Sequence, residues 1–144
     1  MKPRINLKKT LLALLLTASS TLCFAQCDKA ATLTSSITNY YNDKGEVERT
    51  KEEDTSIKLS KSEVIISHGD NDERTLVGAN KTYTCNWPIP FKEGKTVITT
   101  LLTDGGQDMH VTITVEGKDG KVTLTFEAEE MPGKKIKVVA NKFE

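Results

Sequence analysis

Residues 109–128 are Met-His-Val-Thr-Ile-Thr-Val-Glu-Gly-Lys-Asp-Gly-Lys-Val-Thr-Leu-Thr-Phe-Glu-Ala, and this stretch decides the fold. Apolar residues alternate with polar ones on both sides of Asp119-Gly120, which is the period of a half-buried β-strand. An Asp-Gly pair is also a preferred two-residue hairpin turn. When this pair forms the turn, Ile113 faces Phe126 and the apolar residues of both segments share one face. Turn chemistry and hydrophobic pattern therefore predict the same hairpin.

Similar hairpins are predicted on either side of this one. With Gly105-Gly106 as a turn, the apolar residues of the preceding segment fall on the same face as Ile113. On the other side, a three-residue connection, Met131-Pro132-Gly133, places Ile136 opposite Ala128. Four consecutive antiparallel strands are therefore predicted, at about residues 95–102, 109–115, 121–128 and 134–142.

The first half of the chain carries weaker strand signals. Turns at residues 43–45 and 60–63 align apolar residues on either side of them. A further pair of strands is predicted between residues 74–77 and 81–87, across a turn at Gly78-Ala79-Asn80.

Residues 28–41 are ambiguous between helix and strand. Ala30, Leu33 and Ile37 have helical spacing behind Asp28, a residue type that caps helices. The same stretch also fits alternation, and its five Ser and Thr residues favour a strand. We favour the strand and keep the helix as the alternative.

Eight or nine short strands joined by short connections predict an all-β fold. The connections are too short for the crossover helices of a parallel sheet, which leaves an antiparallel up-and-down meander. Such a meander must bury one face, either by closing into a small barrel or by folding into a two-sheet β-sandwich. We favour the barrel, because closure leaves no unpaired strand edge.

In this architecture the chain resembles the lipocalin-like, or calycin, β-barrels, over most of residues 26–144. Members of those families often carry Gly-x-Trp in their first strand, whereas residues 31–41 contain no tryptophan. The single tryptophan, Trp87, lies mid-chain in Cys-Asn-Trp-Pro-Ile-Pro. The resemblance therefore implies a barrel fold and no particular activity.

Residues 1–25 have the pattern of a secretory signal peptide. A basic start is followed by an apolar run at residues 11–16, and small residues precede a cleavage position after Ala25. We therefore expect a single all-β domain at residues 26–144, in a periplasmic or secreted protein that is not inserted in a membrane. The alternative is an uncleaved N-terminal anchor.

Removal of the leader changes the charge and the cysteine count. It takes four of the 20 basic residues and none of the 20 acidic ones, which leaves a net charge of −4. A mildly acidic surface argues against nucleic acid or an anionic membrane as a partner, because both require a basic patch. Two cysteines remain, Cys27 and Cys85. In an oxidising compartment they predict one disulfide, whose long loop stabilises the fold by roughly 4 kcal/mol.

Motifs for catalysis, metals and cofactors are scarce. The chain has two histidines, and the alternation places His110 on the polar, exposed face of its strand. The acidic run Asp70-Asn71-Asp72-Glu73 lacks the spacing of an EF-hand loop, although a loose calcium site there is an alternative to a polar turn. The sequence has no nucleophile elbow and no phosphate-binding glycine loop. We therefore expect no enzyme activity, no bound metal and no cofactor.

The segment from Tyr83 to Phe91 is the strongest candidate for a functional site. Tyr83, Cys85 and Trp87 share a face if the segment is a strand, and two prolines then end it. In a ligand-binding role, Trp87 and Phe91 would form the wall or gate of a cavity. Tyr83 and Phe126 would line its interior. In a structural role, the aromatic residues would form a core cluster held by the disulfide.

Two functions are compatible with these observations. The favoured one is a non-catalytic barrel that binds a small, partly apolar ligand. The alternative is a β-sandwich that acts through its surface, as an envelope protein-interaction module or inhibitor. Interior volume distinguishes them, because a ligand binder needs a cavity of roughly 300 Å³ or more whereas a filled core needs none.

Overall fold

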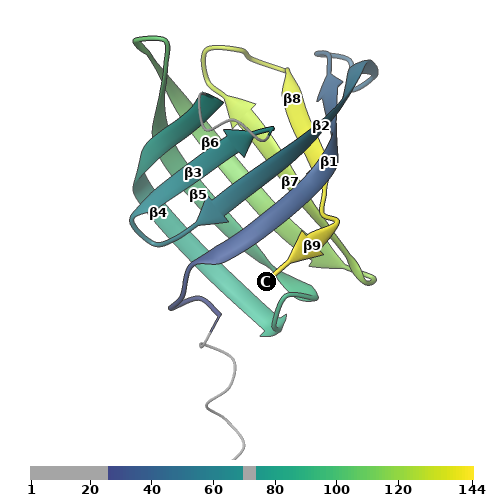
Figure 1. Cartoon of the computed structure of the whole chain (residues 1–144), viewed down its shortest axis with the longest axis vertical. Coiled ribbons are helices and arrows are strands. Elements are labelled where there is room, and N and C mark those ends of the chain that lie inside the picture. Colours follow the sequence, from purple (N-terminus) through teal and green to yellow (C-terminus); the bar gives the residue numbers. More distant parts are fainter. Residues whose placement is uncertain (1–25, 70–73) are drawn as a thin grey trace, which may run out of the picture.

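The computed structural model describes residues 26–69 and 74–144 (Figure 1). The expected signal peptide at residues 1–25 and the acidic run at residues 70–73 lie outside the described residues. The described part of the chain is an all-β domain, and it holds no helix long and apolar enough to cross a membrane. Its strands are β1 (Ala31–Tyr41), β2 (Val47–Leu59), β3 (Glu63–His68), β4 (Thr75–Ile89), β5 (Glu93–Asp104), β6 (Gln107–Lys118), β7 (Lys121–Ala128), β8 (Lys135–Val139) and β9 (Lys142–Phe143).

The first eight strands close into one antiparallel barrel. Each strand from β1 to β7 pairs with the next, and β8 pairs in turn with β1, which leaves no break between two separate sheets (Figure 1). The short strand β9 continues the pairing along β1, where Phe143 is opposite Leu33. The up-and-down barrel and the strand at residues 31–41 are therefore confirmed, and the two-sheet sandwich and the helical alternative are wrong.

The central hairpins have the registers that their turns predict. Across Asp119-Gly120, Ile113 pairs with Phe126. Across Gly105-Gly106, Ile98 pairs with Ile113. The buried apolar residues of these strands point into the barrel, and the threonines of β6 and β7 lie on the outer face.

The connection from β7 to β8 is longer than the sequence analysis predicts. A three-residue turn would pair Ile136 with Ala128, but Ile136 pairs with Phe126. Two successive hydrogen-bonded turns, at residues 128–131 and 131–134, form the connection instead. The register moves by two residues, so Ile136 still faces the interior.

The predicted turn at Gly78-Ala79-Asn80 is wrong. These residues belong to the long strand β4, and the two segments expected to pair with each other are its two halves. The first half pairs with β3, and most of the strand pairs with β5. A Cβ atom on Gly78 would lie 2.5 Å from Thr100 Oγ1 and 2.7 Å from Leu102 Cδ2. Close packing inside the barrel, rather than a turn, therefore requires the glycine.

The two ends of the barrel differ. The closed end comprises residues 26–30, the connections β2–β3, β4–β5 and β6–β7, and Glu144 (Figure 1). The open end comprises the connections β1–β2, β5–β6 and β7–β8, with the end of β3 and the start of β4. Buried apolar side chains fill the half nearer the closed end: Leu33, Ile57, Leu59, Val64, Trp87, Ile98, Ile113, Val115 and Leu124.

Both ends of the described chain are fastened at the closed end. Cys27 forms the predicted disulfide with Cys85, and their Cα atoms lie 5.7 Å apart. The Glu144 N–H donates to the Thr32 carbonyl at 3.1 Å, and the Thr32 N–H donates to the Glu144 carbonyl at 2.7 Å. The disulfide is consistent with an oxidising compartment.

Trp87 occupies the interior of the closed end. Its side chain is 1% exposed, and its indole N–H donates to Thr96 Oγ1 at 2.7 Å. The centre of the Phe143 ring lies 5.2 Å from the centre of the Trp87 ring system. Gly94 and Gly117 make room for the indole, because a Cβ atom on Gly117 would lie 2.6 Å from Trp87 Cζ3. A large aromatic residue thus closes this end of the barrel.

Candidate ligand-binding site

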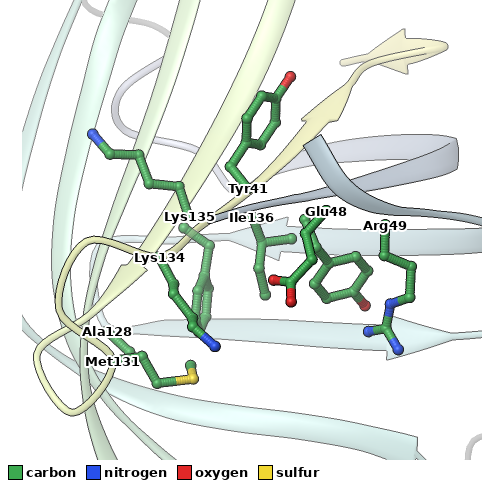
Figure 2. Close-up of a pocket in the computed structure, with 10 residues that line it drawn as sticks. Tyr41, Glu48, Arg49, Ala128, Met131, Lys134, Lys135 and Ile136 are labelled. Atoms are coloured by element: carbon green, nitrogen blue, oxygen red, sulfur yellow. The ribbon is translucent and has the colours of Figure 1, made fainter. Parts of the chain in front are cut away.

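An apolar pocket of about 540 Å³ lies at the open end, between the β1–β2 hairpin and the β7–β8 connection (Figure 2). Its floor consists of Phe126 and Ala128 from β7 and Ile136 from β8. Met131, from the connection between these strands, contributes a wall. Phe126 is 9% exposed and Met131 is 39% exposed, so the pocket extends from the barrel interior to solvent.

Positive side chains border the apolar pocket. The Arg49 guanidinium carbon lies 4.1 Å from the centre of the Tyr40 ring, and the two residues pair between β2 and β1. Figure 2 shows Glu48, from β2, beside Ile136, with Arg49 of the same strand farther to the side and Lys134 coming from the β7–β8 connection. Within the described residues, neither Arg49 nor Lys134 forms an ion pair. The rim of the apolar pocket therefore carries two cations, Arg49 and Lys134, and one carboxylate, Glu48, none of which forms an ion pair within the described residues.

A second, polar pocket of about 530 Å³ also lies at the open end and shares Tyr40 with the first. The inner face of β2 contributes Lys51 and Glu53, which form an ion pair. Glu53 Oε1 lies 3.6 Å from His68 Nδ1, and Thr55 Oγ1 lies 3.4 Å from the same nitrogen. Charged side chains thus point into the barrel along the open half of β2.

The His68 cluster does not have the geometry of a catalytic triad. In a triad the nucleophile and the acid contact opposite ring nitrogens of the histidine. Here Thr55 and Glu53 both face Nδ1 of His68. Across the described residues, no group of three or more His, Cys, Asp or Glu side chains could hold a metal ion. The arrangement can bind polar groups, but it assembles no activated nucleophile.

A buried hydroxyl lies one step deeper than Tyr40 on the inner face of β1. Thr38 is 3% exposed, and it pairs with Lys51 on β2 and Val138 on β8. Its Oγ1 has no hydrogen-bond partner among the described residues. Buried hydroxyls normally have a partner, so this group is an exception within the described part of the barrel.

The β7–β8 connection is fixed to β6 beside the apolar pocket. Both carboxylate oxygens of Glu130 accept a hydrogen bond from the His110 backbone N–H, at 2.9 and 3.1 Å. Glu130 Oε1 also lies 3.0 Å from His110 Nδ1. These bonds, the backbone one above all, lower the pKa of Glu130 below its ordinary value of 4.5. His110 is exposed, as the alternation predicts.

The structure separates the four residues predicted to bind a ligand. Trp87 and Phe91 lie at the closed end, where the Phe143 ring centre is 5.2 Å from each. Tyr83 lies half-buried on the inner face of β4, and burial raises the pKa of its hydroxyl above 10.0. Phe126 lines the apolar pocket. Of the two roles that the sequence leaves open for Trp87, the structure shows the core role.

Sequence reasoning missed the charged inner residues of β2. They continue the alternation of the buried residues Leu59 and Ile57 towards the open end, two residues at a time, to Lys51 and Arg49. Counting back from the apolar end of the strand would have found them. The signal was overlooked because charged residues normally indicate an outer face.

Comparisons of the chain with family models, curated proteins and solved structures found no match. The likeness to lipocalin-like barrels therefore concerns the closed barrel alone and indicates no particular function.

Proposed function

We propose that this protein binds a small, partly apolar ligand with an anionic group at the open end of the barrel, and that it does not transform it. One observation carries the proposal. The apolar pocket of about 540 Å³ has Phe126 and Ile136 in its floor, and Arg49 and Lys134 at its rim lack ion-pair partners within the described residues. An apolar body would pack on the floor while its anionic group meets the cations.

The size and chemistry of the pocket support this class of ligand. Small-molecule sites usually measure roughly 300–1,000 Å³ and combine apolar walls with a few polar groups. Burial of the apolar body would contribute about 25 cal/mol per Å² removed from water. Arg49 is already oriented by its contact with the Tyr40 ring, so little side-chain freedom is lost on binding. The two cations also oppose the net charge of −4 expected for the mature chain, which favours an anion at this point of the surface.

We also infer that the protein is exported, with cleavage after Ala25, and acts in the periplasm or outside the cell. The Cys27–Cys85 disulfide supports an oxidising compartment. The basic and apolar pattern of residues 1–25 supports a cleaved leader.

Action through the outer surface is the second candidate. One observation favours it: Ile65 pairs with Val77, and Ala79 pairs with Leu101, on the outer face of β3, β4 and β5. Val77 is exposed, and Ile65 and Leu101 are half-buried. Isolated exposed apolar residues are common on soluble proteins, so this group is weaker evidence for an interaction surface than the apolar pocket is for a binding site.

Three eight-carbon probes test the binding proposal: octanoate, octan-1-ol and octylammonium. They share an apolar chain and differ in charge. Isothermal titration calorimetry on the disulfide-bonded mature protein should show octanoate binding most tightly and octylammonium most weakly. Equal affinities would refute the role of the cations. If none of the three binds the folded protein, binding of such ligands at the open end is refuted and the surface candidate is preferred.

Charge-removing variants locate the site. The double change Arg49→Gln and Lys134→Gln should weaken octanoate binding by about tenfold or more, because a hydrogen bond to a charged group contributes roughly 1.5–3 kcal/mol. Lys137→Gln is the matched control, since Lys137 lies over the Tyr41 ring and outside the apolar pocket. An equal loss in the control would show that general charge, rather than the pocket, attracts the anion.

A further inference from the structure

Gln26 is held at the closed end by its side chain. The Phe91 backbone N–H donates to Gln26 Oε1 at 2.7 Å, and Gln26 is 7% exposed. The next residue, Cys27, is tied to Cys85 by the disulfide. Phe91 has a φ of +59°, a conformation that a bulky residue rarely adopts unless its surroundings impose it. The side-chain carbonyl of Gln26 is therefore kept against a fixed donor.

We propose that Gln26 becomes the N-terminal residue and is converted to pyroglutamate. The inference rests on the cleavage after Ala25 proposed above, which would give Gln26 a free α-amine. The amine nitrogen attacks the side-chain carbon Cδ, and a new C–N bond closes a five-membered ring. The bond from Cδ to the amide nitrogen Nε2 breaks, a proton passes from the attacking amine to this nitrogen, and ammonia leaves. No oxidant, reductant or other reactant is required.

The neutral amine is the form that attacks a carbonyl. One contact of Gln26 favours this reaction. The Phe91 N–H, which already contacts Oε1, opposes the negative charge that develops on this oxygen as the amine adds.

The product also fits the site. The lactam of pyroglutamate retains the carbonyl oxygen, so the bond from Phe91 is kept. Cyclisation also removes the positive charge of the α-ammonium, next to the disulfide-bonded Cys27. The mature chain would then offer no free amine to an aminopeptidase.

Mass spectrometry of the exported, non-reduced protein tests the proposal. The full chain is expressed with its own leader, and the intact mass and the fragmented N-terminal peptide are measured. We expect a chain that starts at residue 26 and lacks the mass of one ammonia molecule, besides the two hydrogen atoms lost in the disulfide. The N-terminus should resist Edman degradation until pyroglutamyl aminopeptidase is added.

Two controls keep the outcomes distinct. Gln26→Asn retains an amide but would have to close a strained four-membered ring, so its mass should show no loss of ammonia. A synthetic peptide of residues 26–30, handled in parallel, should cyclise more slowly than the folded protein; equal rates would overturn the role of Phe91. A chain that starts at residue 26 with an intact glutamine overturns the cyclisation and leaves the cleavage standing. A chain that starts elsewhere overturns both.

Discussion

The closed and open ends of this barrel are built from the same strands, but the interior is apolar at the closed end and carries charged side chains at the open end. At the closed end, Trp87 is buried against Phe143 and the Cys27–Cys85 disulfide holds the wall. At the open end, the same inner face of β2 that began with Leu59 reaches Arg49. The difference teaches that one strand can serve the core with one half and a pocket with the other.

This division has an energetic reason. Charges that point into a barrel reduce the apolar area that can be buried, and they must remain near solvent or be paired. The open half of β2 satisfies both conditions, because Glu53 pairs with Lys51 and the pocket that they line reaches the surface. The closed half must therefore supply most of the hydrophobic stabilisation. Mutations at the two ends should separate stability from binding.

The largest effect is expected from Trp87→Ala at the closed end. Removal of a fully buried tryptophan should lower the free energy of unfolding by about 3–5 kcal/mol. Met131→Ala at the open end should change it by about 0.5 kcal/mol or less, because this side chain is 39% exposed. Urea denaturation followed by circular dichroism measures both. Similar losses in the two variants would remove the distinction between the ends.

Gly117→Ala should have the next largest effect. The added Cβ would lie 2.5 Å from the Lys92 carbonyl oxygen and 2.6 Å from Trp87 Cζ3, so backbone or indole must move. Overpacking of this kind costs about 1–3 kcal/mol. The neighbouring outer-face change Glu116→Ala is the control and should be nearly neutral. If thermal unfolding shows no difference between them, the indole is less tightly enclosed than the distances indicate.

Arg49→Gln should affect ligand binding more than stability, the opposite of what is expected for changes at Trp87. It removes the contact with the Tyr40 ring, which stabilises the fold by about 0.5–1 kcal/mol at most. It should nevertheless weaken octanoate binding more than Trp87→Phe does, because Arg49 lines the pocket and Trp87 lies at the other end. Calorimetric titration of both variants gives the comparison. A greater loss of affinity in Trp87→Phe would place the ligand at the closed end.

The smallest effect is the pH dependence of the contact between Glu130 and His110, beside the apolar pocket. The backbone N–H of His110, followed by its side chain, lowers the pKa of Glu130 below 4.5. The stabilisation from this carboxylate is therefore complete above pH 4.5 and is lost as the pH falls through the lower, folded-state pKa. Hydrogen exchange at the His110 amide should accelerate over that range relative to neighbouring β6 amides, and Glu130→Gln should weaken the pH dependence. A pH profile unchanged in Glu130→Gln would assign the effect to another group.

The registers that depend on near neighbours could be predicted from the sequence. The hairpin at Asp119-Gly120 follows from its turn residues and from the apolar alternation on both sides. The meander of neighbouring hairpins also followed, and it had to bury one face. Its closure into a barrel rather than a sandwich depends on the pairing of β1 with β8, which no local turn predicts.

Features that depend on distant residues could not be predicted. Gly78 resembles a turn residue, but the requirement for glycine comes from Thr100 and Leu102 on another strand. The location of the pocket likewise depends on which end the single tryptophan fills. Aromatic residues beside prolines suggest an opening, whereas Trp87 and Phe91 contribute to the closed end. The alternation of β7 predicts that Phe126 points inward, and this strand places it in the floor of the pocket.

The pairing of Glu144 with Thr32 has a practical consequence for orientation. Both termini of the domain lie at the closed end, opposite the apolar pocket. A tether, a fusion partner or a solid support attached to either terminus would therefore leave the pocket facing solvent. The barrel can therefore be immobilised through either terminus with its open end facing solvent.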